Sequence, residues 1–130
     1  MTRRISSGTP WEPVAGYSRA VAAGSPSCIT SPSSTDVQPA TKTKSPAAQT
    51  TQAIANVAAA LERLGASLAD VVRTRLYVTD IARWREYAQA HGAAFGEIRP
   101  ASTMVEVAAL IDARMLVEVE ADAYRPGAGR

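Results

Sequence analysis

Two segments of the chain carry apolar residues at helical spacing. Between Ala47 and Gly65 the apolar positions recur every three or four residues, at Ile54, Val57, Ala58, Leu61 and Leu64. Gly65 stands where a left-handed C-terminal cap is needed, so this range is predicted to form a helix. A second helix is predicted to begin after Asp80, a good N-cap residue, and to end by Gly96 and Pro100. Its apolar side comprises Ile81, Trp84, Tyr87, Ala88, His91 and Phe95.

Other segments alternate between apolar and polar residues and are predicted to be strands. In residues 71–80 one face carries Val72, Thr74, Leu76 and Val78, and the other carries Arg73, Arg75, Tyr77 and Thr79. Residues 99–110 and 115–124 alternate in the same way. The short segment between them can form a hairpin turn, so we expect these two strands to pair antiparallel. A further short strand is predicted within residues 14–21.

This order of elements predicts an α+β fold in which both helices cover one face of a sheet. Tyr77, Met104 and Leu116 are expected on the other face, beside charged groups, and apolar residues on an uncovered face indicate self-association. Residues 24–46 are rich in Ser, Thr and Pro and are predicted to be a loop or disordered tract.

Composition narrows the class of protein further. The chain has 130 residues, of which 46% are hydrophobic, enough for the core of one domain, residues 1–130. The net charge of +2 is spread along the chain without a basic stripe, so we expect no nucleic-acid partner. One Cys and one His are too few for the usual zinc or iron sites, so no metal is expected. Neither a signal peptide nor an apolar run of about 20 residues is present, so we expect a cytoplasmic protein without a membrane partner.

Four blocks of sequence resemble the RidA family, also called YjgF or reactive intermediate deaminase proteins. They are GYSRAV at residues 16–21, QTTQAIANVAAALERLGASLADVVRTRLYVTD at 49–80, RPASTMVEV at 99–107 and LVEVEADA at 116–123. The resemblance implies a chorismate-mutase-like fold that assembles as a homotrimer, with the sheets around a central barrel and ligand clefts between subunits. Active members of the family hydrolyse reactive imines and enamines to ketoacids and ammonia, and the resemblance implies no metal or organic cofactor.

The resemblance also implies positions for the ligand cleft. Glu118 falls on the carboxylate proposed to position the attacking water, and Tyr17 falls on the cleft tyrosine. The remaining positions implied for the cleft are Thr30, Ala88, Ser102 and Met104. Ser102 stands where the deaminase subgroup has an arginine that grips the substrate carboxylate, and a hydroxyl cannot replace a bidentate guanidinium.

Three functions therefore stay open. The first is the binding of a small imine, enamine or carbonyl metabolite and its hydrolysis with water positioned by Glu118, and the second is a non-catalytic metabolite-binding or regulatory trimer. The third is the endoribonuclease or translation-inhibitor activity ascribed to some members of the family, against which the lack of a basic stripe weighs. Glu106 and Glu120 are interpreted as solvent or intersubunit residues, and His91 as a packed histidine.

The tract at residues 24–46 has about the length that the family uses there but lacks the expected second strand. One hypothesis is that it is a stretch read in a shifted frame. The other is a diverged crossing in which Cys28–Thr30 remains a strand.

Overall fold

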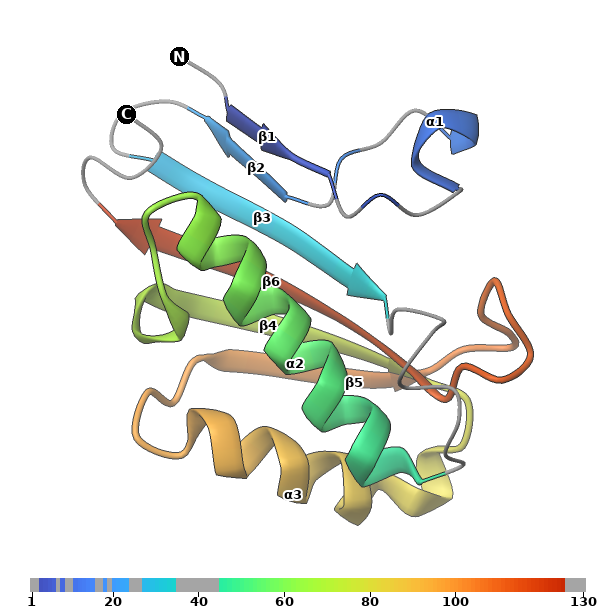
Figure 1. The fold of residues 1–130 in the computed structure, drawn as a ribbon. Coiled ribbons are helices and arrows are strands. Elements are labelled where there is room, and N and C mark those ends of the chain that lie inside the picture. Colours follow the sequence, from blue (N-terminus) through green and yellow to red (C-terminus); the bar gives the residue numbers. More distant parts are fainter. Residues whose placement is uncertain are drawn as a thin grey trace.

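A six-stranded mixed sheet forms the frame of the molecule (Figure 1). In the computed structural model, the described residues are 3–6, 8, 11–15, 18, 20–23, 27–34 and 45–125. The strand order across the sheet is β1-β2-β3-β6-β4-β5. The strands are β1 (Arg3–Ile5), β2 (Ala20–Ala23), β3 (Ser27–Ser34), β4 (Val71–Val78), β5 (Ala101–Glu106) and β6 (Val117–Arg125). The helices are α1 (Trp11–Ala15), α2 (Pro46–Arg63) and α3 (Trp84–Phe95), with short 3-10 turns η2 (Leu68–Asp70) and η3 (Ile81–Arg83).

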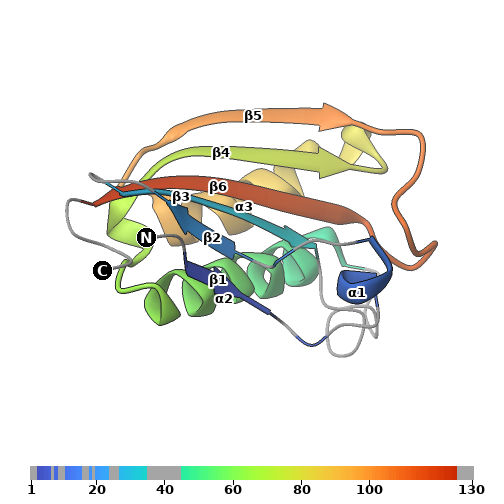
Figure 2. The same ribbon diagram turned by 90° about the horizontal axis from the view of Figure 1, so that it is seen from above.

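The two long helices α2 and α3 lie on the same side of the sheet (Figure 2). Helix α2 packs on β3 and β6 and contacts α3 along its flank. The core lies between these helices and the sheet, and its largest fully buried apolar side chains are Tyr87, Leu61, Leu64, Leu76, Met115, Val57, Val78, Val117 and Val119. The structure thus confirms the predicted α+β class with both helices on one face. We call the other side of the sheet the open face.

Helix α2 begins and ends at capping groups that the sequence supplies. The side chain of Ser45 accepts a hydrogen bond from the backbone N–H of Ala48 at 3.2 Å, and Pro46 occupies the first turn, where its missing N–H costs nothing. The chain leaves the helix through Gly65, whose φ of 81° is easily reached only by glycine. The predicted first helix is confirmed with these bounds.

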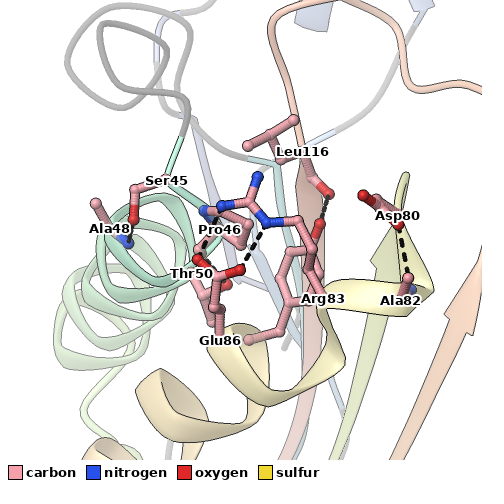
Figure 3. A network of polar contacts seen from close by, with 10 residues as sticks. Ser45, Pro46, Ala48, Thr50, Asp80, Ala82, Arg83, Glu86 and Leu116 are labelled. Carbon is pink, nitrogen blue, oxygen red and sulfur yellow. Dashed lines mark hydrogen bonds and ion pairs between the residues drawn. The ribbon is translucent and has the colours of Figure 1, made fainter.

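Helix α3 is preceded by the turn η3, and Asp80 caps that turn (Figure 3). The Asp80 carboxylate accepts from the N–H of Ala82 at 3.2 Å, and Arg83 forms an ion pair with Glu86 at 2.6 Å. The predicted capping role of Asp80 is therefore confirmed. The regular α-helix begins later than predicted because the first turn after Asp80 is a 3-10 turn.

Strand β4 departs from simple alternation at its start. The register with β6 shifts between Val71 and Arg73, as in a β-bulge. Val71 is therefore buried in the core while Val72 is 54% exposed. The prediction that Val72 shares the core face with Leu76 is wrong because the bulge adds one residue to the strand.

The predicted hairpin between the last two strands is also wrong. Strand β4 lies between β5 and β6, and it pairs parallel with β5 and antiparallel with β6. Helix α3 connects β4 to β5 as a crossover, which allows the two strands to run parallel. Residues 107–116 then cross β4 and lead into β6 on its other side. Met104, which is paired with Leu76, and Leu116 pack against the core, so the expectation that they lie on the open face is wrong as well.

The N-terminal half contains elements that the pattern did not predict. Residues 14 and 15 belong to α1 and residues 20 and 21 to β2, so the strand predicted in residues 14–21 agrees with the structure at its end and is wrong at its start; residues 16, 17 and 19 lie outside the described residues. Strand β3 lies inside the tract 24–46 and pairs antiparallel with β2 and β6, so the prediction of a loop or disordered tract is wrong for residues 27–34. This strand includes Cys28–Thr30, the strand of the diverged-crossing hypothesis, and is longer than that hypothesis expected. Strand β2 pairs with β3 only at Cys28–Thr30. Among the described strands, Pro32 therefore has a neighbouring strand on one side only, which is β6. A strand position with one unpaired side tolerates the missing N–H of proline.

Candidate functional site

The open face carries a row of acidic side chains along β6. Alternate residues of this strand are buried beneath the helices, whereas Glu118, Glu120 and Asp122 are half-buried and point to the open face. In the register with β4, Glu118 lies opposite Tyr77 and Glu120 lies opposite Arg75. The open face is therefore polar and charged around Glu118.

Glu120 and Asp122 on this row contact side chains of β4. The Tyr77 hydroxyl donates to Glu120 Oε1, and this hydrogen bond, followed by burial, raises the pKa of Tyr77 above its ordinary value. Arg75 Nη1 lies 3.3 Å from Asp122 Oδ2, in an ion pair whose side chains remain partly exposed. These contacts give Glu120 a structural role on the open face, beside Glu118.

The start of β6, just before Glu118, is held by a buried glutamine. The Gln49 side chain is fully buried; its Nε2 donates to the Arg114 carbonyl at 3.0 Å, and its Oε1 accepts from the Leu116 N–H at 2.8 Å. The Leu116 carbonyl in turn accepts from the Thr79 N–H at 3.1 Å and from the Tyr87 hydroxyl at 3.3 Å. Figure 3 shows Leu116 beside the starts of α2 and α3. Sequence reasoning missed Gln49, although its position on a helix that packs on the sheet was a usable signal.

A second polar cluster lies on the helix-covered side of the sheet, at the β5 edge. Thr74 Oγ1 donates to Ser102 Oγ at 2.8 Å and lies 2.8 Å from His91 Nε2. Thr74 is completely buried, His91 is half-buried and Ser102 is exposed. The cluster therefore runs from the interior to the surface across three elements, α3, β4 and β5.

His91 also packs against an aromatic ring. Its ring centroid lies 4.7 Å from that of Phe95, and burial lowers the pKa of His91 below its ordinary value because the imidazolium loses hydration. This packing agrees with the interpretation of His91 as a packed histidine. Its hydrogen bond to Thr74 was not predicted.

The six residues that the resemblance implies for the cleft do not gather at one point of a single chain. Glu118 lies on the open face, whereas Ser102 and Met104 lie on the helix-covered face of β5. Ala88 is half-buried on α3, one turn before His91. Thr30 lies on β3 opposite Asp122, and Tyr17 lies outside the described residues.

Glu106 has a role that the sequence did not indicate. This residue is exposed, and its Oε1 accepts a hydrogen bond from the Ile81 N–H at 3.0 Å at the start of η3. Glu106 therefore provides a hydrogen-bond acceptor for a backbone N–H at the start of the turn that leads into α3.

Within the described ranges no group of three His, Cys, Asp or Glu residues could hold a metal ion. No helix in the described part of the chain is long and apolar enough to cross a membrane.

The fold and the acidic open face place the protein among small α+β proteins built on a mixed sheet with helices on one side. The family model described as Endoribonuclease L-PSP matches residues 8–125. The chain belongs to this family, the YjgF/RidA family, as its sequence blocks predict.

Relatives agree with this assignment over nearly the whole chain. An uncharacterized protein of Streptomyces coelicolor is 33% identical over 123 residues, which cover 95% of this chain and 92% of the relative. The structure of Rv2704, a YjgF/YER057c/UK114 family member from Mycobacterium tuberculosis, is similar at 47% identity with a TM-score of 0.87, covering 96% of this chain and 100% of that one. The YjgF gene product of E. coli is similar at 26% identity with a TM-score of 0.71, covering 94% and 93%.

Proposed function

We propose that this protein binds a small imine, enamine or carbonyl metabolite in clefts between the subunits of a homotrimer and hydrolyses the imines and enamines with water positioned by Glu118. The observation that carries the proposal is the position of Glu118. It is a half-buried carboxylate on the open face of the sheet, and the start of its strand is anchored by the buried side chain of Gln49. A carboxylate on a rigid, anchored strand is suited to accept a proton from a bound water.

The chemistry needs one proton acceptor and no redox step. The water oxygen forms a bond to the imine carbon while its proton passes to the Glu118 carboxylate, and the electron pair of the C=N π bond moves to nitrogen. The carboxylate returns the proton to nitrogen, which gives a neutral carbinolamine. The carboxylate then takes the hydroxyl proton and passes it to the departing nitrogen while the oxygen lone pair forms the C=O bond and the C–N bond breaks, so the products are a carbonyl compound and ammonia. For an imine that carries a carboxylate, the carbonyl product is a ketoacid.

The division of the cleft residues between two faces supports the intersubunit part of the proposal. Glu118 and Ser102 lie on opposite faces of the sheet, so a site that uses both needs residues from a second copy of the chain. A polar open face with half-buried Tyr77 and Glu120 is also a surface that another subunit can cover. Sedimentation equilibrium tests this part, and we expect the mass of three chains; a monomer would contradict the trimer.

The catalytic part is tested by following ammonia and ketoacid release from an imine generated in situ by a pyridoxal-phosphate enzyme. We expect Glu118→Gln to lower the rate by about 10²-fold or more, because the proton acceptor is lost while the shape is kept. The matched control is Glu120→Gln, on the same strand and face, whose carboxylate contacts Tyr77. Equal rates for wild type and Glu118→Gln would refute the assigned role.

A second candidate function is favoured by Ser102. The deaminase subgroup is expected to have an arginine at this position, and here the hydroxyl is bonded to Thr74. A non-catalytic metabolite-binding or regulatory trimer is therefore the alternative. Hydrolysis that is absent in the wild type and appears in Ser102→Arg would support this alternative.

A further inference from the structure

We infer that Ser102 is the exposed end of a hydrogen-bond chain through Thr74 to His91 and that this chain forms a ligand site selective for an uncharged carbonyl or imine over a free carboxylate. The inference rests on the proposed function in one respect, that Ser102 lines the ligand cleft. It goes further by naming the class of ligand and two positioning residues, Thr74 and His91.

The hydrogen bonds from Ser102 through Thr74 to His91 are continuous. The two contacts of the Thr74 hydroxyl, to Ser102 Oγ and to His91 Nε2, are both 2.8 Å long. Thr74 is completely buried, so its hydroxyl has these two groups and no bulk water as partners. Ser102 lies on β5, the strand at the edge of the sheet, and is exposed.

The hydroxyl protons allow two directions along these hydrogen bonds, and the inferred site takes the one in which Thr74 donates to Ser102. Thr74 has one hydroxyl hydrogen, which it donates to Ser102, so its oxygen accepts from His91. In this direction the neutral His91, the form that burial favours, carries its proton on Nε2 and donates it to Thr74. Ser102 accepts from Thr74 and keeps its own O–H, which can be donated to the oxygen or nitrogen of a ligand.

The charges around the chain argue against a carboxylate ligand. The charged residue on the same face of β5 is Glu106, whose carboxylate repels anions. On α3 and the turn before it, Arg83 is paired with Glu86, and the Arg85 guanidinium lies 4.6 Å from the Trp84 ring centroid. A carboxylate at Ser102 would lose hydration without gaining a cation, which disfavours it relative to a neutral acceptor.

Arg99 is the cation that could reverse this preference. It precedes β5, is exposed, and has a φ of 55° at the turn that follows α3. If Arg99 supplies the missing guanidinium, anionic ligands bind through it and Ser102 is irrelevant. The test therefore includes the variant Arg99→Gln.

Binding is measured with two probes that differ in charge, pyruvamide and pyruvate. The signal is the imidazole of His91 in a long-range ¹H–¹⁵N spectrum of protein without a histidine tag, because this is the single histidine of the chain. We expect pyruvamide to shift the His91 resonances and to bind about tenfold more tightly than pyruvate, reflecting the uncompensated burial of the anion. Ser102→Ala should weaken pyruvamide binding by about fivefold, the loss expected for one neutral hydrogen bond.

Matched variants distinguish the role of the hydrogen-bond chain from general effects of substitutions on β5. Thr103→Ala removes the neighbouring hydroxyl, which is also exposed but lies on the opposite face of β5, and should leave binding unchanged. Thr74→Val should shift the His91 Nε2 resonance and weaken pyruvamide binding, whereas Thr74→Ser, which keeps the hydroxyl, should restore both.

Three results would overturn the inference: pyruvate binding as tightly as pyruvamide, no effect of Ser102→Ala, or no binding of either probe. Pyruvate binding that is lost in Arg99→Gln would assign the site to Arg99 instead. These binding results are separate from the hydrolysis assay. That assay would refute the proposed function if the rate of hydrolysis did not depend on Glu118.

Discussion

Replacing Gln49 by leucine tests whether the buried glutamine holds the strand that carries Glu118. Leucine approximately keeps the side-chain volume, so the main change is the loss of two hydrogen bonds, to the Arg114 carbonyl and the Leu116 N–H. Each buried backbone group left without a partner costs about 1–3 kcal/mol. Because Arg114 is exposed and its carbonyl can turn to water, we expect a total loss of about 2–4 kcal/mol in the free energy of unfolding.

The assay is urea unfolding followed by circular dichroism at one fixed protein concentration, because self-association makes stability depend on concentration. The expected result is a lower urea midpoint with an unchanged slope. The control is Gln52→Leu on the same helix, where the half-buried side chain bonds only to Asn56 at 2.9 Å among the described residues, and a change within about 0.5 kcal/mol is expected. A loss in Gln49→Leu no larger than in this control would refute the anchoring role.

Two further predictions concern His91 and the core. Burial lowers the pKa of His91 below its ordinary 6.5, so the unfolded chain binds more protons, and stability should fall as pH drops through about 6.5 and level off below the folded pKa. Urea titrations between about pH 7.5 and about pH 5 should show this loss in wild type and not in His91→Gln. Leu61→Ala removes a fully buried side chain and should cost about 2–5 kcal/mol in the same assay. Val72→Ala, at the exposed bulge, should change stability by less than about 0.5 kcal/mol; a large effect there would contradict its placement.

The helices and the central strands could be predicted from the chain because their signals are local. Helix α2 has a repeating apolar stripe and a glycine cap, and β6 alternates buried and half-buried residues along its whole length. These periodicities follow from the geometry of helix and strand and need no knowledge of neighbours. The family blocks then allowed the fold to be predicted by resemblance.

Strand order could not be read from alternation, because any two alternating strands satisfy the same pattern. The sequence suggested a hairpin between the last two strands, whereas tertiary packing placed β4 between them. The bulge that exposes Val72 and the strand formed by the Ser-rich tract also depend on hydrogen bonds to partner strands. Backbone pairing does not require apolar side chains, so β3 left no periodic signal.

For the candidate site, the sequence by itself determined which chemical groups are present: a carboxylate at Glu118, a hydroxyl at Ser102 where an arginine was expected, and one histidine. Only the tertiary structure decided which of them meet. It placed Glu118 and Ser102 on opposite faces of the sheet and joined Ser102 through Thr74 to His91. The reason is that contacts between residues far apart in sequence depend on strand register and helix placement, which are set by the packing of the whole domain.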